Sequence, residues 1–337
     1  MRITVTGGAG YIGSHTCSLL LKAGHQVQII DSFANAKPDV PDRIHEVSGH
    51  TPDVVSADIT DRAALGSALA AFQPEAVVHF AGLKAVGEAV SNPLEYYRVN
   101  VAGSLTLFQA MEEIACNRVV FSSSATVYGD PNTVPIPEDH PLRPTNPYGH
   151  SKRHVEQIIE DWGKANPNLA AVNLRYFNPV GAHPSARLGE EPQGVPNNLM
   201  PYVAQVATGQ RKELSVFGDD YDTPDGTGVR DYIHVMDLAA AHLKALDLTA
   251  AHSGVYAINV GTGQGYSVLD MVRAFKRASN RDIPYKITDR RPGDVATSLA
   301  DPGRAADLLN WTAQHGLDQM CADAWAWETL RQSISDH

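Results

Sequence analysis

The sequence contains little cysteine, with only Cys17, Cys116 and Cys321 among its 337 residues. The three are far apart, and no two have the spacing of a metal-binding pair. We therefore expect neither a disulfide framework nor a metal at the functional site. Three reduced, packed thiols in a cytosolic protein are the simpler interpretation.

Long apolar runs and an excess of positive charge are also missing. No stretch approaches the roughly 20 apolar residues that cross a membrane. The chain begins on a strand pattern, without the basic and apolar segments of a signal peptide. The formal net charge of −11 argues against nucleic acid or a membrane surface as partner. We expect a cytoplasmic protein, whose pockets can still be basic enough for an anionic ligand.

Alternating strand and helix patterns indicate the fold class. A length of 337 residues exceeds the size at which single cores usually stop growing, so two lobes are expected. Repeated strand–helix–strand units predict an α/β fold, with a doubly wound parallel sheet of Rossmann type and a smaller mixed α/β lobe. The strands of the sheet are expected at residues 3–6, 25–30, 54–55, 76–80, 118–122 and 170–176.

The composition changes after Asn178. Residues 179–230 are rich in Gly, Pro, Asn and Asp, which is typical of loops that carry binding groups, with one short helix around 200–208. Further helices are expected at 238–248 and at 267–278, the second with Ser267 as N-cap. We expect a first domain over 1–177 and a second lobe over 178–337, with segments around 230–260 returning to the first domain.

A glycine-rich turn near the N-terminus predicts a dinucleotide site. Gly7, Gly10 and Gly13 lie between the first strand and a helix. They permit a tight turn, a close approach of the pyrophosphate and close packing of helix on strand. The helix N-terminus then faces the phosphates. Asp31 ends the next strand, where a carboxylate binds ribose hydroxyls and repels a 2′-phosphate, so NAD is favoured over NADP.

Later strands end in further candidate cofactor contacts. Asp58 and Ile59 follow the third strand and can hold the adenine, although Asp58 could instead cap the next helix. The candidate contacts at the end of the fourth strand are Phe80, Ala81, Gly82 and Lys84. The small residues among them, Ala81 and Gly82, would let a cofactor lie against backbone.

Tyr148 and Lys152 lie four residues apart on a predicted helix, so both side chains share one face. A phenol with an ordinary pKa near 10 is a poor base at neutral pH. A nearby ammonium, together with the positive charge of a bound nicotinamide, favours the phenolate and makes Tyr148 a usable proton acceptor. The spacing alone is common on solvated helices, so its meaning depends on the other motifs.

Together these motifs resemble the extended short-chain dehydrogenases/reductases, and within that group the UDP-glucose 4-epimerase family. The glycine turn and the Tyr/Lys pair are shared across the superfamily, whereas the later segments are more specific. The resemblance runs nearly end to end and is carried by residues 6–15, 79–88, 121–129, 148–152, 175–182, 196–201 and 228–235.

The resemblance implies an NAD-dependent interconversion of UDP-glucose and UDP-galactose. Tyr148 would take the 4-hydroxyl proton, Lys152 would be its electrostatic partner, and Ser124 would bond the reacting hydroxyl. Carbon 4 would pass its hydride to a tightly bound NAD, and the 4-keto sugar would turn about the pyrophosphate before the hydride returns to its other face. A homodimer formed through helices of the first lobe is implied as well.

Two sets of contact residues follow from the resemblance. NAD would also contact Lys152, Tyr148, Tyr11, Ile12, Ser32, Asn35, Ala36, Asn100, Ser122 and Phe177. The UDP-hexose would contact Ser124, Tyr148, Tyr176, Asn178, Asn198, Leu199, Phe217, Arg230, Arg291, Asp294 and Ser298. The two arginines can clamp a diphosphate with charge-assisted bonds, and Asp294 can accept from a ribose hydroxyl.

Two other functions are disfavoured by particular residues. Nucleotide-sugar 4,6-dehydratases of this fold resemble the chain, but they typically carry an Asp-Glu pair after the position of Ser124. Ala125 and Thr126 stand there instead. A non-enzymatic NAD sensor or scaffold would be expected to lose the Tyr148/Lys152 pair, which is present.

Ser298 bears on the choice of sugar. Some 4-epimerases place a bulky Tyr at the matching position, where it crowds the 2-substituent. Ser298 therefore predicts room for UDP-GlcNAc and UDP-GalNAc beside the unsubstituted pair. The alternative is that a neighbouring residue or a loop shift fills the space.

Overall fold

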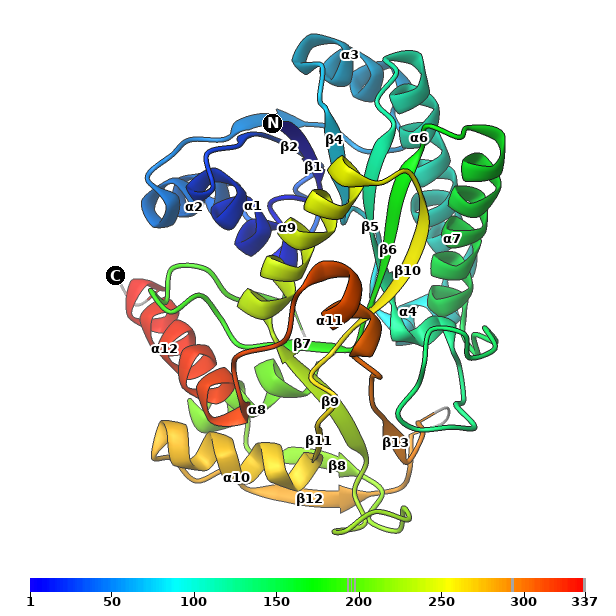
Figure 1. Cartoon of the computed structure of the whole chain (residues 1–337). Coiled ribbons are helices and arrows are strands. Elements are labelled where there is room, and N and C mark those ends of the chain that lie inside the picture. The colour runs from blue at the N-terminus through cyan, green and yellow to red at the C-terminus, as the bar shows by residue number, and fades with distance from the viewer. Residues whose placement is uncertain (193, 195, 197, 292–293, 336–337) are drawn as a thin grey trace.

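A seven-stranded parallel sheet dominates the computed structural model, which describes residues 1–192, 194, 196, 198–291 and 294–335 (Figure 1). The strand order is β10-β6-β5-β4-β1-β2-β3, so the order reverses between β1 and β4, as in a Rossmann fold. This confirms the predicted fold class. The strands are β1 Arg2–Thr6, β2 Gln26–Asp31, β3 Asp53–Ser56, β4 Ala76–His79, β5 Arg118–Ser124, β6 Ala170–Tyr176 and β10 Gly254–Val260.

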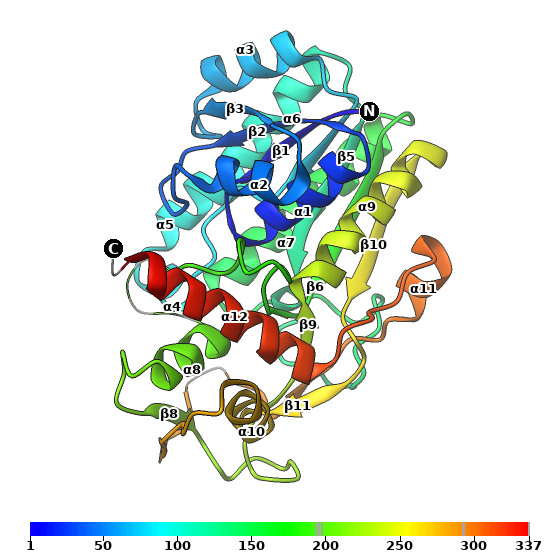
Figure 2. The same ribbon diagram turned by 90° about the vertical axis from the view of Figure 1, so that its left-hand side faces the viewer.

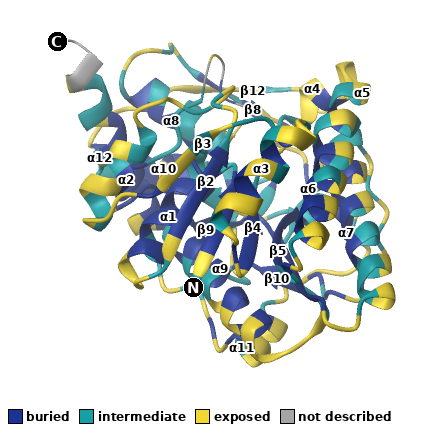
Figure 3. Ribbon diagram, turned by 90° about the horizontal axis from the view of Figure 1, so that it is seen from above, coloured by how far each residue is buried: buried dark blue, intermediate teal, exposed yellow. Residues whose placement is uncertain are grey.

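Helices cover both faces of this sheet (Figures 1 and 2). Its central strands are buried on both sides (Figure 3), which explains their near-continuous apolar sequences. One face packs against α1 Tyr11–Lys22, α2 Val40–Ser48 and α9 Val235–Ala251. The other packs against α3 Arg62–Phe72, α6 Gly103–Glu113 and α7 Pro147–Ala165.

A nearly continuous helical run leads from β4 into α6. It begins with α4 Val86–Ser91 and α5 Pro93–Tyr96, and a π-helical turn over Tyr97–Ala102 joins α5 to α6. Such turns are frequent at functional sites. This one carries Asn100, which is buried.

The second lobe is built on a small mixed sheet and three helices around their own apolar core. Ser267 caps α10 as predicted, because its hydroxyl accepts a hydrogen bond from the Asp270 N–H at 2.9 Å. The strands are β7 Asn178–Val180, β9 Val229–His234, β11 Gly265–Ser267 and β13 Thr297–Ser298, with a separate pair β8 Leu214–Phe217 and β12 Tyr285–Thr288. The helices are α8 Leu199–Ala207, α10 Val268–Ser279 and α12 Leu317–Ser335.

The chain passes between the lobes more than once. After β9 it enters α9, which packs on α1, and then β10, which pairs in parallel with β6. The short α11 Gly303–Leu309 lies against α9 and β10 (Figure 1). None of the helices in the described ranges is long and apolar enough to cross a bilayer.

Candidate active site

The glycine turn follows β1 and approaches the loop after β4. Gly7 has a φ of +70°, and an added Cβ there would lie 2.6 Å from the Ala81 backbone nitrogen. An added Cβ at Gly13 would lie 2.8 Å from the Gly8 Cα. Gly10 caps α1 without a side chain, so the first N–H groups of that helix can bind an anion.

Asp31 ends β2 directly beside this turn. Its two carboxylate oxygens accept hydrogen bonds from the Ala9 N–H at 3.0 Å and the Phe33 N–H at 2.9 Å. Burial raises the pKa of Asp31, and these backbone bonds oppose the rise. Each oxygen keeps further lone-pair capacity for a ribose hydroxyl. Ser32, Asn35 and Ala36 lie in the following loop, between β2 and α2.

The structure excludes one of the two interpretations of Asp58, that it caps the following helix. Its carboxylate accepts bonds from the N–H and the hydroxyl of Thr60, both at 2.8 Å. The cap of α3 is Asp61, which accepts from Ala63 and Ala64. Asp58 is therefore not the helix cap, while Ile59 beside it is buried.

Asn100 joins the loop after β4 to the start of α7. Its Oδ1 accepts from the Leu83 N–H at 2.7 Å, and its Nδ2 donates to the Leu83 carbonyl and to the Ser151 hydroxyl, both at 3.0 Å. Ser151 in turn donates to the Tyr148 carbonyl. The loop that carries the predicted contact residues 80–84 is thus tied at Leu83, through Asn100, to the start of the helix that carries Tyr148.

Tyr148, Lys152 and Ser124 come together where β5 ends against α7. Desolvation by burial raises the pKa of Tyr148 to about 12, and a hydrogen bond with Ser124 opposes the rise. Burial likewise lowers the pKa of Lys152 to about 8, with the Glu156 carboxylate opposing that change. The Lys152 ammonium donates to the Ser122 carbonyl at 2.8 Å and lies 5.9 Å from the centre of the Tyr148 ring.

Burial of Tyr148 works against the phenolate in the protein alone, because desolvation is the largest cause of its raised pKa. A further positive charge beside the phenol is needed for the phenolate to form near neutral pH. Tyr176 and Phe177 are both buried nearby at the end of β6, and the Tyr176 hydroxyl contacts Ser122.

The predicted UDP-sugar residues of the second lobe include one group at β9 and β13 and a stacked pair at the end of β8. Ser298 pairs with Arg230 between these strands, and the Arg230 guanidinium lies 3.8 Å from Asp294. The Arg291 guanidinium stacks on Phe217 at 4.4 Å from its ring centre. Asn178 starts β7, and Leu199 is the first residue of α8. Asn197, within the 196–201 segment given above, and the neighbours of Arg291 and Asp294 at positions 292 and 293 lie outside the described residues.

Glu190 is a contact residue that no sequence motif indicates. One of its carboxylate oxygens accepts from the Lys84 ammonium at 2.8 Å and from the Asn198 amide at 2.7 Å. It thereby joins a predicted cofactor residue to a predicted substrate residue. The ion pair of Glu156 and Arg175, beside Lys152, is likewise not indicated by any sequence motif. Both depend on tertiary contacts between distant segments, for which the sequence carries no local signal.

Comparisons with known proteins extend over almost the whole chain. Residues 4–324 match the family model described as GDP-mannose 4,6 dehydratase. A UDP-glucose 4-epimerase of Bacillus subtilis (strain 168) is 54% identical over 98% of this chain and 97% of its own length. The UDP-glucose 4-epimerase of Homo sapiens is 52% identical over 98% of this chain and 97% of its own.

A solved structure agrees with these relatives. The UDP-glucose 4-epimerase of Stenotrophomonas maltophila, with bound NAD and formylated UDP-arabinopyranose, superposes with a TM-score of 0.97 at 47% identity. The match covers 99% of each chain.

The dehydratase alternative depends on the two residues after Ser124. They are Ala125 and Thr126, and the Thr126 hydroxyl donates to Ser124. Neither residue is a carboxylic acid that could serve a dehydratase.

Proposed function

The chain belongs to the UDP-glucose 4-epimerase family, within the larger family that the GDP-mannose 4,6 dehydratase model describes, and on that basis we propose that it interconverts UDP-glucose and UDP-galactose. The observation that carries the proposal is the cluster of Tyr148, Ser124 and Lys152 at the carboxyl end of β5. It stands at the same edge of the sheet as the glycine turn after β1.

NAD is the cofactor that this edge of the sheet fits. At Gly7 and Gly13 the neighbouring backbone is too close for any side chain. The N-terminus of α1, which no side chain caps, suits a pyrophosphate. Asp31 suits a ribose diol and opposes a 2′-phosphate. When bound, NAD takes a hydride from carbon 4 of the sugar and later returns it to the opposite face, so it is regenerated in each cycle.

In the mechanism that we propose, Tyr148 holds and returns one proton. It remains partly exposed, so the 4-hydroxyl can reach the phenol, whereas Lys152 beneath it is buried. With a pKa of about 8, Lys152 is still largely protonated at pH 7 and places a cation near the phenol. Ser124 bonds the phenol and stands where it can also bond the reacting hydroxyl.

The second lobe would hold the UDP part while the sugar turns over. Arg230 and Arg291 can bind the diphosphate, and Asp294, already close to Arg230, can accept from a ribose hydroxyl. Holding the nucleotide leaves the sugar attached by single bonds, about which it can present either face to the same Tyr148.

The activity is tested with purified protein and no added cofactor. We expect conversion of UDP-galactose into UDP-glucose, and NAD released in about equimolar amount when the protein is denatured. Folded, NAD-containing protein without interconversion would contradict the proposed reaction.

Ser298 supports a wider substrate range that includes UDP-GlcNAc and UDP-GalNAc. It is a small side chain paired with Arg230, within the group of predicted sugar-binding residues. Ser298→Tyr should lower kcat/KM for UDP-GalNAc by about 10–200-fold, the usual effect of filling a pocket, and leave UDP-galactose turnover largely unchanged. Ser298→Ala, which stays small, serves as the control. Equal UDP-GalNAc activity in wild type and Ser298→Tyr would contradict this proposal.

We also propose a homodimer formed through helices of the first lobe. Val90 on α4, Leu94 on α5 and Leu105 on α6 are 63%, 81% and 43% exposed, so these helices offer apolar surface that a second copy could cover. Leu94→Glu combined with Leu105→Glu should convert the dimer into a monomer, as measured by light scattering after size exclusion. Tyr285→Glu, at an exposed apolar site of the second lobe, should leave the dimer intact. A monomeric wild type would contradict the proposal.

A further inference from the structure

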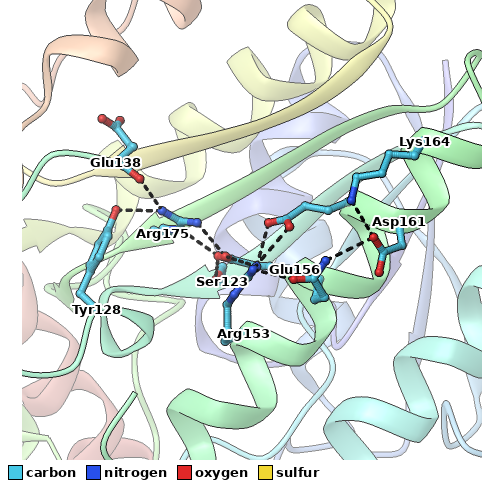
Figure 4. Close-up of polar contacts among 10 residues, drawn as sticks. Ser123, Tyr128, Glu138, Arg153, Glu156, Asp161, Lys164 and Arg175 are labelled. Atoms are coloured by element: carbon cyan, nitrogen blue, oxygen red, sulfur yellow. Dashed lines mark hydrogen bonds and ion pairs between the residues drawn. The ribbon is translucent and has the colours of Figure 1, made fainter. Parts of the chain in front are cut away.

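A buried ion pair lies directly beneath the Tyr148/Lys152 pair. Glu156 follows Lys152 by one helical turn on α7, and its side chain is 0% exposed. Arg175, on β6, is 3% exposed and donates to both carboxylate oxygens, through Nε at 2.9 Å and Nη2 at 2.8 Å (Figure 4). A pair buried to this degree loses much hydration and is often no more stabilising than apolar residues of similar volume. Its place beside the candidate active site therefore suggests a role other than stability.

The pair extends the contact between α7 and the end of β5. Three successive β5 residues meet three α7 side chains that are four residues apart. Ser124 bonds Tyr148, and the Ser122 carbonyl accepts from Lys152. Ser123 donates to Glu156 at 2.6 Å. Glu156 is thus the third of three equally spaced contacts, and it is the one without a place in the proposed reaction.

Arg175 holds Glu156 from the strand side. It pairs in register with Ser123 between β5 and β6, so both side chains leave the sheet on the face covered by α7. Its Nη1 donates to the Tyr128 hydroxyl at 3.2 Å and to the Glu138 carbonyl at 3.0 Å. Because its donors are committed to these partners, Arg175 fixes the position of the Glu156 carboxylate.

Among the described residues, few other groups lie where they can influence the charge of Lys152. Tyr148 and Glu156 face it from α7, with Arg153 3.8 Å from Glu156 on the solvent side. From the sheet, His79 ends β4 and Tyr176 ends β6. Burial lowers the pKa of His79 to about 3, with Lys152 contributing, and burial raises the pKa of Tyr176, so both are neutral. Tyr96 on α5 lies near Tyr148, and burial raises its pKa as well. Within the described part of the chain, Glu156 is therefore the anion that favours the Lys152 ammonium.

We propose that Glu156, held by Arg175, is a positioning residue that keeps Lys152 protonated and in place beside Tyr148. The proposal rests on the proposed function for the roles of Tyr148 and Lys152. The protonation state of Lys152, on which the proposal depends, can be measured without assaying enzymatic activity.

The test compares Glu156→Gln with wild type over pH. Wild-type kcat should fall as Lys152 loses its proton near pH 8. In Glu156→Gln this alkaline limb should move to lower pH by about one unit, since removal of a nearby opposite charge shifts a pKa by that order. Glu156→Asp, which keeps the negative charge, should leave the alkaline limb close to its wild-type position. Asp161→Asn, an exposed carboxylate of α7 paired with Lys164, should shift nothing.

A second readout separates this proposal from the epimerase activity. The ¹³Cε resonance of Lys152, assigned by its loss in Lys152→Met, should titrate at lower pH in Glu156→Gln than in wild type. If Glu156→Gln does not fold, the double variant Glu156→Leu/Arg175→Met, which removes both charges and keeps the volume, should show the same direction of shift. An unchanged Lys152 titration in the folded variant overturns the proposal. Absence of turnover in wild type would contradict only the proposed function.

Discussion

Tyr148→Phe is expected to lose about 10²–10⁴-fold in kcat while keeping NAD and UDP-sugar binding, because general acid–base catalysis by one group contributes that much. The substitution removes only the hydroxyl, which bonds Ser124. The aromatic ring near the Lys152 ammonium remains. The measurement is turnover of UDP-galactose, with bound NAD determined after denaturation and UDP affinity determined by titration.

Tyr256→Phe is the matched control for this prediction. Tyr256 lies on β10 and donates to the Ser253 carbonyl at 3.1 Å, away from the candidate site. Loss of its hydroxyl should leave kcat unchanged. Near-normal turnover in Tyr148→Phe would mean that another group takes the proton, and the proposed mechanism would have to be abandoned.

Gly13→Ala is expected to leave the protein without bound NAD and with a lower melting temperature. Gly13 lies within α1, where alanine would ordinarily stabilise a helix by about 0.5–1 kcal/mol. Here the added Cβ would overlap the backbone of the glycine turn, at 2.8 Å from the Gly8 Cα. Backbone cannot move aside as a flexible side chain can, so α1 must shift away from β1. That shift would displace the phosphate-binding N–H groups.

Gly66→Ala provides the opposite expected result on the same fold. Gly66 lies in α3, and an added Cβ there meets nothing within 4 Å. This variant should keep its NAD and gain stability. An NAD-loaded Gly13→Ala protein with wild-type melting temperature would show that α1 does not pack against the backbone of the glycine turn as closely as we infer.

The sequence allowed the first lobe to be predicted because its signals are local. Apolar strands of four to seven residues alternate with helices, and the glycine spacing has backbone reasons that hold in any such turn. The second lobe is harder to predict from sequence, since its strands are short and pair with strands that are distant in the chain. Residues 179–230 were predicted as loops with one helix, yet they contain β7 and β8, which pair with β9 and β12.

Burial explains what the motifs could not reveal about the candidate site. Tyr148 and Lys152 were correctly placed on one helix face, but their spacing says nothing about hydration. Desolvation raises the pKa of Tyr148 and lowers that of Lys152. The contacts of Glu156 with Arg175 and of Glu190 with Lys84 join segments that are far apart in sequence, so only the folded chain brings them together.

The most direct test of the account follows the hydrogen on carbon 4. UDP-galactose carrying deuterium at that carbon is incubated with purified protein in ordinary water, without added NAD, and the UDP-glucose is analysed by NMR. We predict that the product keeps the deuterium on carbon 4, because the same hydride leaves and returns within one active site. Product with solvent hydrogen at carbon 4 would contradict the account.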